Sequence, residues 1–464
     1  PGDRVASWEA KGELTCLLPL AAPRAGLVHV PVNPLLKRAQ VSHIVGDSGA
    51  RLLLGTQSRL ASLEPGDIPA DCAVLNEDEA LAQSIDAEWL GPSNADPDML
   101  AAILYTSGST GRPKGVMLSH ANMWLGADSV ADYLGLAAHD ATLAVLPLSF
   151  DYGQNQLLST WYAGGCVVPL DYLAPRDVVK AVERHAITTL AAVPPLWVQL
   201  TELDWPSETA ARLRRLTNSG GALTEDLVRK LRALFPQARL FPMYGLTEAF
   251  RSTFLPPEEV DRRPDSIGKA IPNAEVLVLR EDGTPCAPNE PGELVHRGAL
   301  VGMGYWNDPE KTAERYKPLP PHAPGREAGL VIPELAVFSG DTVRMDEEGF
   351  LYFVGRRDEM MKTSGYRVSP TEVEEILYET KLVGECVAFG VDHPTLGQAI
   401  QVIATPPGAG SLDVDALLAE CKARMPAYMV PAGISVREGP LPRNPNGKID
   451  RKALSTEWKE AHER

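Results

Sequence analysis

Short apolar runs alternate with amphipathic stretches along most of the chain, a pattern typical of layered α/β proteins. Helices are predicted where apolar residues return every three or four positions, at residues 177–185 and 225–234. Buried strands are predicted where apolar residues are continuous, at residues 51–54, 141–146, 166–168 and 190–193. We therefore expect helices and strands in alternating layers over this part of the chain.

The pattern changes near residue 271, after which short strands separated by Gly, Pro and Asn turns are predicted at residues 275–279, 293–297 and 351–354. A Pro-rich stretch at residues 318–324 is expected to be an exposed loop. Further on, the pattern predicts a helix at 370–380, a strand at 385–391 and a helix at 414–425. Because 464 residues exceed one compact core, we expect a large domain over residues 1–354 and a small one over 355–464.

Composition narrows the class of protein. The formal net charge of −17, from 44 basic and 61 acidic residues, argues against nucleic acid or an anionic membrane as the main partner. Six cysteines are scattered without a C-x-x-C pair, which favours reduced thiols in the cytoplasm over a disulfide framework or a zinc site. No apolar stretch approaches the roughly 20 residues of a membrane span. An iron- or flavin-dependent oxidoreductase is not supported, because no cluster of His, Cys or acidic residues has the needed spacing.

The segment from Tyr105 to Gly115 carries the clearest chemical signal. Its hydroxyls and glycines suit a loop that grips phosphate, because small residues let the backbone approach an anion and Lys114 adds positive charge. The spacing is neither that of a Walker loop nor that of a dinucleotide-binding turn. A flexible Ser/Gly linker is the alternative, but a Pro-Lys-Gly clamp and an apolar run follow directly. The candidate phosphate-binding residues are Thr106, Ser107, Gly108, Ser109, Thr110, Gly111 and Lys114.

This segment resembles the signature of the AMP-forming adenylating enzymes, which include acyl-CoA synthetases, peptide-synthetase adenylation domains and luciferase. Further matching motifs follow in the family's order at residues 244–248, 340–341, 355–358 and 446–448. The resemblance implies a large N-terminal domain of layered α/β subdomains plus a β-rich subdomain, followed by a small mobile C-terminal α/β domain. Asp358 matches the family's hinge. The resemblance also implies a strand–helix unit ahead of Pro1, where the sequence reads as the entry to a strand.

The resemblance implies that ATP and Mg²⁺ are bound. The loop at 106–114 would hold the β- and γ-phosphates, Glu248 the metal and Thr247 the α-phosphate. Tyr244 would stack on adenine beside Gly245, and Asp341 would accept both ribose hydroxyls. Outside the family context, each of these residues would be read as part of a turn, a helix cap or an aromatic core. The other implied nucleotide contacts are Gly220, Gly221, Ala222, Arg356 and Arg367.

Lys448 matches the family's catalytic lysine, in a turn ahead of a final helix. It would bridge the attacking carboxylate and the α-phosphate, where two anions converge; without that match, an exposed lysine would be read as a solubilising charge. Residues 362–367 resemble the loop that lines the pantetheine channel after the small domain rotates, with Gly365 supplying clearance. Coenzyme A and a carrier protein present the same arm, so the acceptor stays open.

Asp151, Gly245 and Arg251 are the predicted acid-pocket residues. In amino-acid-activating relatives an Asp after Phe pairs with the substrate ammonium, and a buried ammonium needs such a counter-ion. Arg251 either faces a second carboxylate on the substrate or pairs with Asp151. Residues 245–253 and 364–370 further resemble the acyl-CoA ligases associated with the exosortase A system.

The sequence thus predicts an AMP-forming acid–thiol ligase of the acyl-CoA synthetase type, acting on a small carboxylic or amino acid with CoA or an acyl carrier protein as acceptor. The alternatives are a stand-alone amino-acid adenylation enzyme that loads a carrier protein, and an inactive nucleotide-binding scaffold. We expect a cytoplasmic monomer or homodimer without nucleic acid partners or stable membrane insertion.

Overall fold

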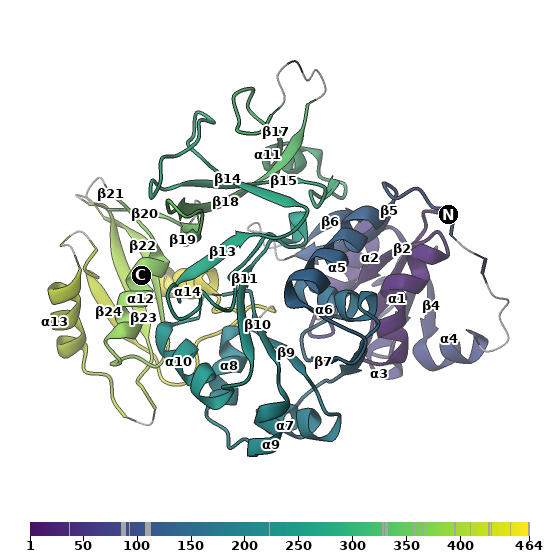
Figure 1. Cartoon of the computed structure of the whole chain (residues 1–464), viewed down its shortest axis with the longest axis horizontal. Helices are drawn as coiled ribbons and strands as arrows, with labels where there is room; N and C mark the ends of the chain where they lie inside the picture. Colours follow the sequence, from purple (N-terminus) through teal and green to yellow (C-terminus); the bar gives the residue numbers. More distant parts are fainter. Residues whose placement is uncertain are drawn as a thin grey trace. The chain divides into compact units, whose positions relative to one another are not determined.

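In the computed structural model the chain forms two compact units. Figure 1 labels their helices and strands and colours them along the sequence. Unit 1 comprises Pro1–Leu277 and Val295–Ser339, and unit 2 comprises Val278–Leu294 and Gly340–Arg464. The structure describes residues 1–36, 38–84, 90–91, 93–106, 113–221, 223–326, 329, 333–356, 359–363, 366–393, 396–408, 410–425, 427, 429–445 and 447–462. Both units combine sheets with helices, which confirms the predicted α/β class.

The first sheet of unit 1 has the strand order β16-β6-β5-β2-β1-β3-β4. From β5 to β4 in this order, neighbouring strands pair parallel. Strand β6 pairs antiparallel with both β5 and β16. Successive side chains of β1 point to opposite faces of the sheet and enter different hydrophobic cores. Val5 packs with helix α1, and Ala6 packs with helix α2. The strands are β1 (Arg4–Trp8), β2 (Val28–Pro31), β3 (Ala50–Gly55), β4 (Ala73–Asn76), β5 (Leu100–Thr106), β6 (Lys114–Ser119) and β16 (Gly304–Tyr305). The helices are α1 (Glu13–Arg24), α2 (Arg38–Ser48), α3 (Gln57–Leu60) and α4 (Glu77–Ser84).

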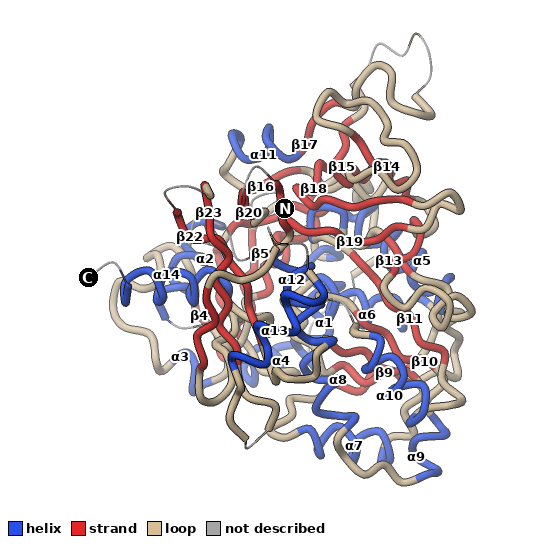
Figure 2. The backbone as a smooth tube through the Cα atoms, turned by 90° about the vertical axis from the view of Figure 1, so that its left-hand side faces the viewer, coloured by secondary structure: helices blue, strands red, loops and turns tan. Residues whose placement is uncertain are grey.

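The second sheet of unit 1 runs β13-β12-β11-β10-β9-β7-β8, and Figure 2 shows its parallel strands β9, β10 and β11 side by side. The predicted strand at 166–168 forms, but the expectation that it is buried is wrong: it is the edge strand, and Cys166 is exposed. The strands are β7 (Ala141–Ala144), β8 (Cys166–Pro169), β9 (Thr189–Ala192), β10 (Arg215–Asn218), β11 (Arg239–Tyr244), β12 (Thr253–Phe254) and β13 (Ser266–Ala270). The helices are α5 (His120–Leu134), α6 (Asp151–Tyr162), α7 (Pro175–Arg184), α8 (Pro194–Thr201), α9 (Ser207–Arg212) and α10 (Glu225–Leu234), with the 3₁₀ turn η1 (Thr247–Ala249).

The β-rich part predicted after residue 271 is also present. Its strands are β14 (Ala274–Leu279), β15 (Gly292–Gly298), β17 (Tyr316–Pro318), β18 (Leu335–Met345) and β19 (Leu351–Arg356), and it carries helix α11 (Pro309–Arg315). The Pro-rich stretch after β17 is not simply an exposed loop, because Leu319 and Ala323 are buried. Their apolar side chains anchor the stretch against the fold.

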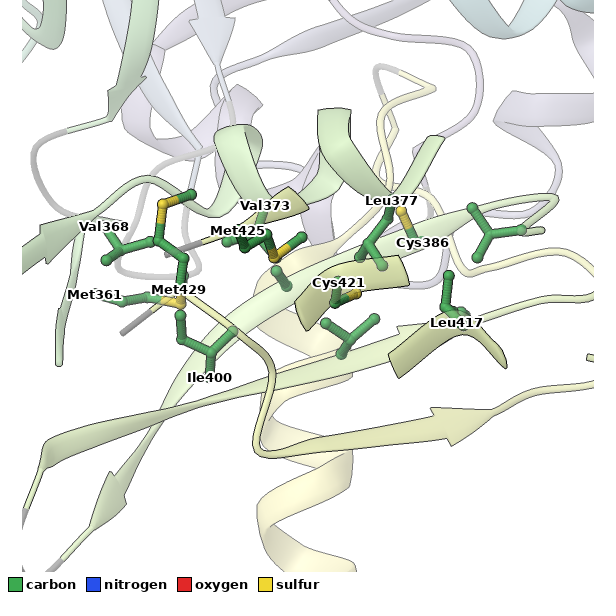
Figure 3. Close-up of a cluster of buried hydrophobic side chains, with 14 residues drawn as sticks. Met361, Val368, Val373, Leu377, Cys386, Ile400, Leu417, Cys421, Met425 and Met429 are labelled. Carbon is green, nitrogen blue, oxygen red and sulfur yellow. The ribbon is translucent and has the colours of Figure 1, made fainter. Parts of the chain in front are cut away.

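The C-terminal part of unit 2 is built on a sheet of order β21-β20-β23-β22, with β24 paired to β23. Helices α12 and α13 contribute to a core on one face of this sheet, as Figure 3 shows for Val373, Leu377, Leu417 and Cys421. Helix α14 contributes Leu454 to a second core, so neighbouring residues of β22 serve different cores. The elements are β20 (Met361–Thr363), β21 (Tyr366–Val368), α12 (Pro370–Glu379), β22 (Cys386–His393), β23 (Gly397–Ala404), α13 (Val414–Arg424), β24 (Gly433–Val436) and α14 (Arg451–His462).

The predicted boundary between residues 354 and 355 marks where a small domain is expected to rotate about a hinge near Asp358. Compact packing does not test a hinge, and Asp358 lies outside the described residues, so the boundary stays a prediction. Within the part of the chain that the structure describes, no helix is both long and apolar enough to cross a membrane.

Candidate active site

Strands β5 and β6 form an antiparallel hairpin that presents the predicted phosphate-binding loop. Thr106, the last residue of β5, lies opposite Lys114, the first residue of β6. The hairpin is tied to helix α2, because the Tyr105 hydroxyl donates to Asp47 Oδ2 at 2.5 Å. Residues 107–111, which carry the remaining predicted phosphate contacts, lie outside the described residues. The structure therefore gives the two ends of the loop.

Tyr305 contacts both Glu248, the predicted metal ligand, and Lys114, the predicted phosphate-binding lysine. The hydroxyl of Tyr305, on β16, donates to Glu248 Oε1 at 2.5 Å. Lys114 Nζ lies 5.7 Å from the centroid of the same ring, within the range of a cation–π contact. Burial, and then the charge of Glu248, raise the pKa of Tyr305, so its hydroxyl stays protonated as a donor. Sequence reasoning missed Tyr305, because no spacing links it to a residue 57 positions away.

The motif at residues 244–248 begins at Tyr244, the last residue of β11, and enters η1. Thr247 is buried, and its hydroxyl donates to Asp151 Oδ1 at 3.2 Å, so this motif contacts the predicted acid pocket. Gly245 is closely packed, because an added Cβ would lie 3.3 Å from Cα of Arg251. A larger residue there would press directly on the arginine.

The glycines predicted to approach the adenine lie just after β10. Gly220 has φ of +81°, a backbone conformation that glycine adopts without strain. Gly221 is fixed by Asn218, whose side-chain amide donates to its carbonyl at 2.8 Å. Ala222 lies outside the described residues. The turn is therefore held in a set conformation by its own strand.

Asp151 is the first residue of α6 and is 4 % exposed. Burial raises the pKa of its carboxyl group, and the charge of Arg251 and the Thr247 hydrogen bond act in the opposite direction. The helix N-terminus and these two neighbours favour the ionised form. This position therefore offers a largely buried carboxyl group that a cationic substrate group would stabilise as a carboxylate.

Arg251 is 1 % exposed, yet among the described residues no carboxylate lies within ion-pair distance of it, Asp151 included. Its Nη1 donates to Ser219 Oγ at 3.2 Å. Its guanidinium carbon lies 4.9 Å from the centroid of the Tyr152 ring, and the Tyr152 hydroxyl is 2.7 Å from Thr217 Oγ1. The alternative in which Arg251 forms an ion pair with Asp151 is therefore not what the structure contains.

The backbone before Arg251 is unusual. Phe250 is fully buried with φ of +58° and ψ of −38°, a conformation that costs free energy for a residue with a side chain. Its ring packs against Gly126 of α5, where an added Cβ would lie 2.2 Å from Phe250 Cδ1. The packing of α5 thus helps to hold the turn from which Arg251 projects.

In unit 2, the two residues predicted to contact the ribose pair with each other. Asp341 of β18 lies opposite Arg356 of β19, and Arg356 Nε donates to Asp341 Oδ1 at 3.2 Å. The side chain of Arg356 is 46 % exposed, so it can reach a ligand by a modest change of rotamer. The two predicted ribose-binding residues, Asp341 and Arg356, therefore lie side by side on adjacent strands.

Lys448 is exposed in a turn just before α14. Asn444 closes the turn with two hydrogen bonds to Lys448. The Asn444 side-chain oxygen accepts from the backbone amide of Lys448 at 3.1 Å, and the Asn444 backbone amide donates to the Lys448 carbonyl at 2.8 Å. Arg451, in the first turn of α14, pairs with Glu374 of α12 at 2.9 Å. The backbone that carries Lys448 is therefore well anchored within unit 2.

The predicted thiol-channel segment is not a simple loop. Its ends form the antiparallel pair β20–β21, with Arg367 opposite Lys362 in the backbone register. Gly365 lies outside the described residues. Over the described part of the chain, no three His, Cys, Asp or Glu residues gather as a metal site.

Comparison with known proteins assigns the chain to a family. Residues 1–306 match the family described as AMP-binding enzyme, and residues 372–448 match the AMP-binding enzyme C-terminal domain. Because the first match alone spans more than half of the chain, this protein belongs to the AMP-binding enzyme family.

Individual relatives span both predicted acceptors. The L-proline–[L-prolyl-carrier protein] ligase of Pseudomonas fluorescens is 32 % identical over 98 % of this chain and 89 % of that protein. Feruloyl-CoA synthase of Amycolatopsis is 30 % identical over 97 % of this chain and 87 % of its own length. Bacitracin synthase 3 of Bacillus licheniformis is 31 % identical over 94 % of this chain, which spans only 6 % of that protein.

Solved structures agree with the fold. The o-succinylbenzoate CoA synthetase of Bacillus subtilis, in complex with its acyl-adenylate intermediate, superposes with a TM-score of 0.84 at 26 % identity, over 98 % of this chain and 88 % of that chain. The same synthetase with ATP and magnesium ion gives 0.83 at 26 % identity, over 98 % and 89 %. These findings show an enzyme of the AMP-forming ligase type with the predicted large and small domains, and leave the inactive scaffold without support.

Proposed function

We propose that this enzyme uses ATP to convert a carboxylic acid into an acyl-adenylate and then transfers the acyl group to a pantetheine thiol. In the first step a carboxylate oxygen bonds to the α-phosphorus while the bond to pyrophosphate breaks. In the second step the thiol sulfur attacks the acyl carbon, AMP leaves and the thiol proton is released. The observation that carries the proposal is the grouping of Lys114, Tyr305 and Glu248 beside the end of a hairpin loop rich in Gly, Ser and Thr.

The residues of unit 1 support the binding of ATP. Lys114 is proposed to contact the outer phosphates, Thr247 the α-phosphate and Tyr244 the adenine. Glu248 fits a magnesium ion, because Mg²⁺ in nucleotide sites is usually held by one or two carboxylates together with phosphate oxygens. Bound there, the metal would offset phosphate charge. Tyr305 would orient the carboxylate of Glu248 by its hydrogen bond.

The residues of unit 2 are proposed to complete the reaction. Asp341 would accept the ribose hydroxyls, with Arg356 released from its pairing to contact ribose or phosphate. Lys448 would place its ammonium group between the carboxylate and the α-phosphate, where charge develops. The hinge at Asp358 and the thiol channel at Gly365 remain proposals that rest on the family resemblance.

A carrier protein as acceptor is the second candidate, and Asp151 is the observation that favours it. A buried carboxyl group beside the pocket suits an amino acid, because an ammonium group would satisfy it, whereas an alkyl chain would leave it unpaired. The carrier-protein ligase among the relatives shows that the fold serves both acceptors. The association with the exosortase A system, the cytoplasmic location and the oligomeric state stay predictions.

The acceptor is tested by following thioester formation. The enzyme, ATP and an activated acid would be supplied with either free CoA or a phosphopantetheinylated carrier protein, and acyl thioester would be measured by mass. Consumption of CoA supports an acyl-CoA ligase, and labelling of the carrier alone supports the second candidate. Accumulation of acyl-AMP with neither thiol acylated would contradict the transfer step.

A further inference from the structure

Arg251 lies at the edge of a small buried cavity between helices α5 and α6 and the second sheet of unit 1. The space open to the centre of a water molecule is about 10 Å³, roughly what one water requires. Its lining combines apolar residues with polar ones, and the polar ones include Arg251, Tyr152, Asn155, Gln156, Thr189 and Thr217. All of these residues belong to unit 1.

Several polar atoms of this lining have no hydrogen-bond partner within the described residues. They include Nε of Arg251, both side-chain polar atoms of Asn155, Oε1 of Gln156 and Oγ1 of Thr189. Buried polar groups in native proteins are nearly always paired, because each unpaired group forfeits its hydration. A water molecule or a polar group of a ligand would therefore complete the cluster.

The charge of Arg251 specifies what that group is. The guanidinium of Arg251 carries a positive charge and is 1 % exposed. Its contacts are the Ser219 hydroxyl and the face of the Tyr152 ring, and neither supplies a negative charge. Asp151 accepts from Thr247 instead. Asp151 attracts Arg251 electrostatically but forms no ion pair with it, so Nε of Arg251 remains a donor that a bound carboxylate can accept from.

We propose that Arg251 selects acids that carry a second carboxylate, and that this distal carboxylate pairs with Arg251 inside unit 1 while the other carboxylate is adenylated. The inference rests on the proposed adenylation function and narrows its substrate class to dicarboxylic acids, with or without an α-amino group. An amino group, where present, would face Asp151.

The test is ATP–pyrophosphate exchange with the full chain on acids matched in length. The pairs are succinate with butyrate, glutarate with valerate, aspartate with 2-aminobutyrate and glutamate with norvaline. In at least one pair, kcat/KM for the dicarboxylic member should exceed that for its partner by roughly 100-fold or more, because a site built to bind a polar group rejects analogues that lack it. Arg251→Met should bring this ratio close to one.

Two further variants keep the result interpretable. Arg251→Lys retains the charge and should keep part of the preference, while Arg232→Met removes a surface arginine paired with Asp261 and should keep all of it. Thermal unfolding of Arg251→Met establishes that the variant is folded before its exchange activity is compared, because the substitution also removes the contacts with Ser219 and Tyr152. A folded Arg251→Met that keeps the preference would overturn the inference.

Different results would contradict the role of Arg251 and the proposed adenylation activity. Exchange driven only by the monocarboxylic member of each pair would overturn the role of Arg251 and leave adenylation standing. No exchange with any acid, from an enzyme whose melting temperature still rises with ATP, would contradict the proposed function and the inference together.

Discussion

Asp151 and Arg251 are the charged side chains whose burial matters most at the proposed acid pocket. Both lie in the interior of unit 1, yet each bonds to a hydroxyl group instead of to the other. The protein therefore keeps two opposite charges available inside one pocket. An amino acid with a second carboxylate would satisfy both charges, whereas a purely aliphatic acid would satisfy neither.

Asp151→Asn tests whether this carboxyl group recognises an ammonium. Exchange driven by amino acids should fall roughly 10- to 100-fold, the usual value of a charge-assisted hydrogen bond, while exchange driven by acids without an amino group should change little. The measurement is kcat/KM for glutamate against glutarate in both proteins. An equal loss for the two acids would show that Asp151 has a structural role instead.

Glu9, which directly follows β1, lies outside the proposed active site. We expect its buried carboxyl group to make the free energy of unfolding depend on pH. Glu9 is 2 % exposed, and burial raises the pKa of its carboxyl group from 4.5 to about 7, with the Thr15 hydrogen bond acting in the opposite direction. The folded state then holds a proton that the unfolded state has lost, so this contribution to stability is present below pH 4.5 and is lost as pH rises to about 7.

Glu9→Gln should remove that loss. The variant should be more stable than wild type at pH 8, by up to roughly 3 kcal/mol, and close to wild type at pH 4.5. Urea unfolding at the two pH values measures the difference. A Glu9→Gln effect that is the same at both pH values would contradict the assignment.

At the scale of elements, the packing of α5 against Phe250 connects helix structure to the pocket. Gly126 leaves room for the ring, and the ring holds the turn that precedes Arg251. Helix α5 is itself fixed at its start by a capping box between Ser119 and Asn122. Asn122 also donates to the carbonyls of Ala299 and Val301, at 3.0 and 3.1 Å, which ties α5 to the β-rich segment.

Gly126→Ala should therefore impair acid binding more than ATP binding. The added methyl group would overlap Phe250, costing roughly 1–3 kcal/mol of stability and raising KM for the acid. Gly46→Ala in α2 is the matched control, because an added Cβ there meets nothing within 4 Å and should stabilise the helix by about 0.5–1 kcal/mol. Equal effects of both variants on KM for the acid would contradict the role of this contact.

Local periodicity predicted many elements well because apolar spacing follows directly from helix and strand geometry. The helix at Glu225–Leu234 matches its prediction residue by residue. The buried character of β8 was wrong, since an apolar run alone does not reveal that a strand lies at a sheet edge. Tyr305 could not be predicted at all, because its contact with Glu248 depends on how β16 pairs with β6.

At the scale of the whole molecule, the proposed catalytic residues are distributed over both units. Glu248, Thr247 and Lys114 belong to unit 1, and Asp341 and Lys448 belong to unit 2. The fold and ligase class follow from the family, whereas the role of each residue remains to be measured. The sequence identified most of these positions through ordered motifs, but it could not show that Arg251 forms no ion pair with the described acidic residues.

Lys448→Ala should lower acid activation by about 100-fold or more while leaving the melting temperature unchanged, because the side chain is exposed and its turn is held by backbone contacts. Single-turnover formation of acyl-AMP measures the first step directly. Arg437→Ala, which removes an exposed ion pair of the same unit, is the control and should retain activity. Unaltered acyl-AMP formation by Lys448→Ala would rule out its proposed role.

The most direct test of the account is acid-dependent exchange of labelled pyrophosphate into ATP by the wild-type chain, with the nucleotide products identified. The account predicts exchange that requires both an acid and Mg²⁺, and AMP as the product once a thiol is supplied. Release of ADP and phosphate, or exchange that does not depend on an acid, would contradict it.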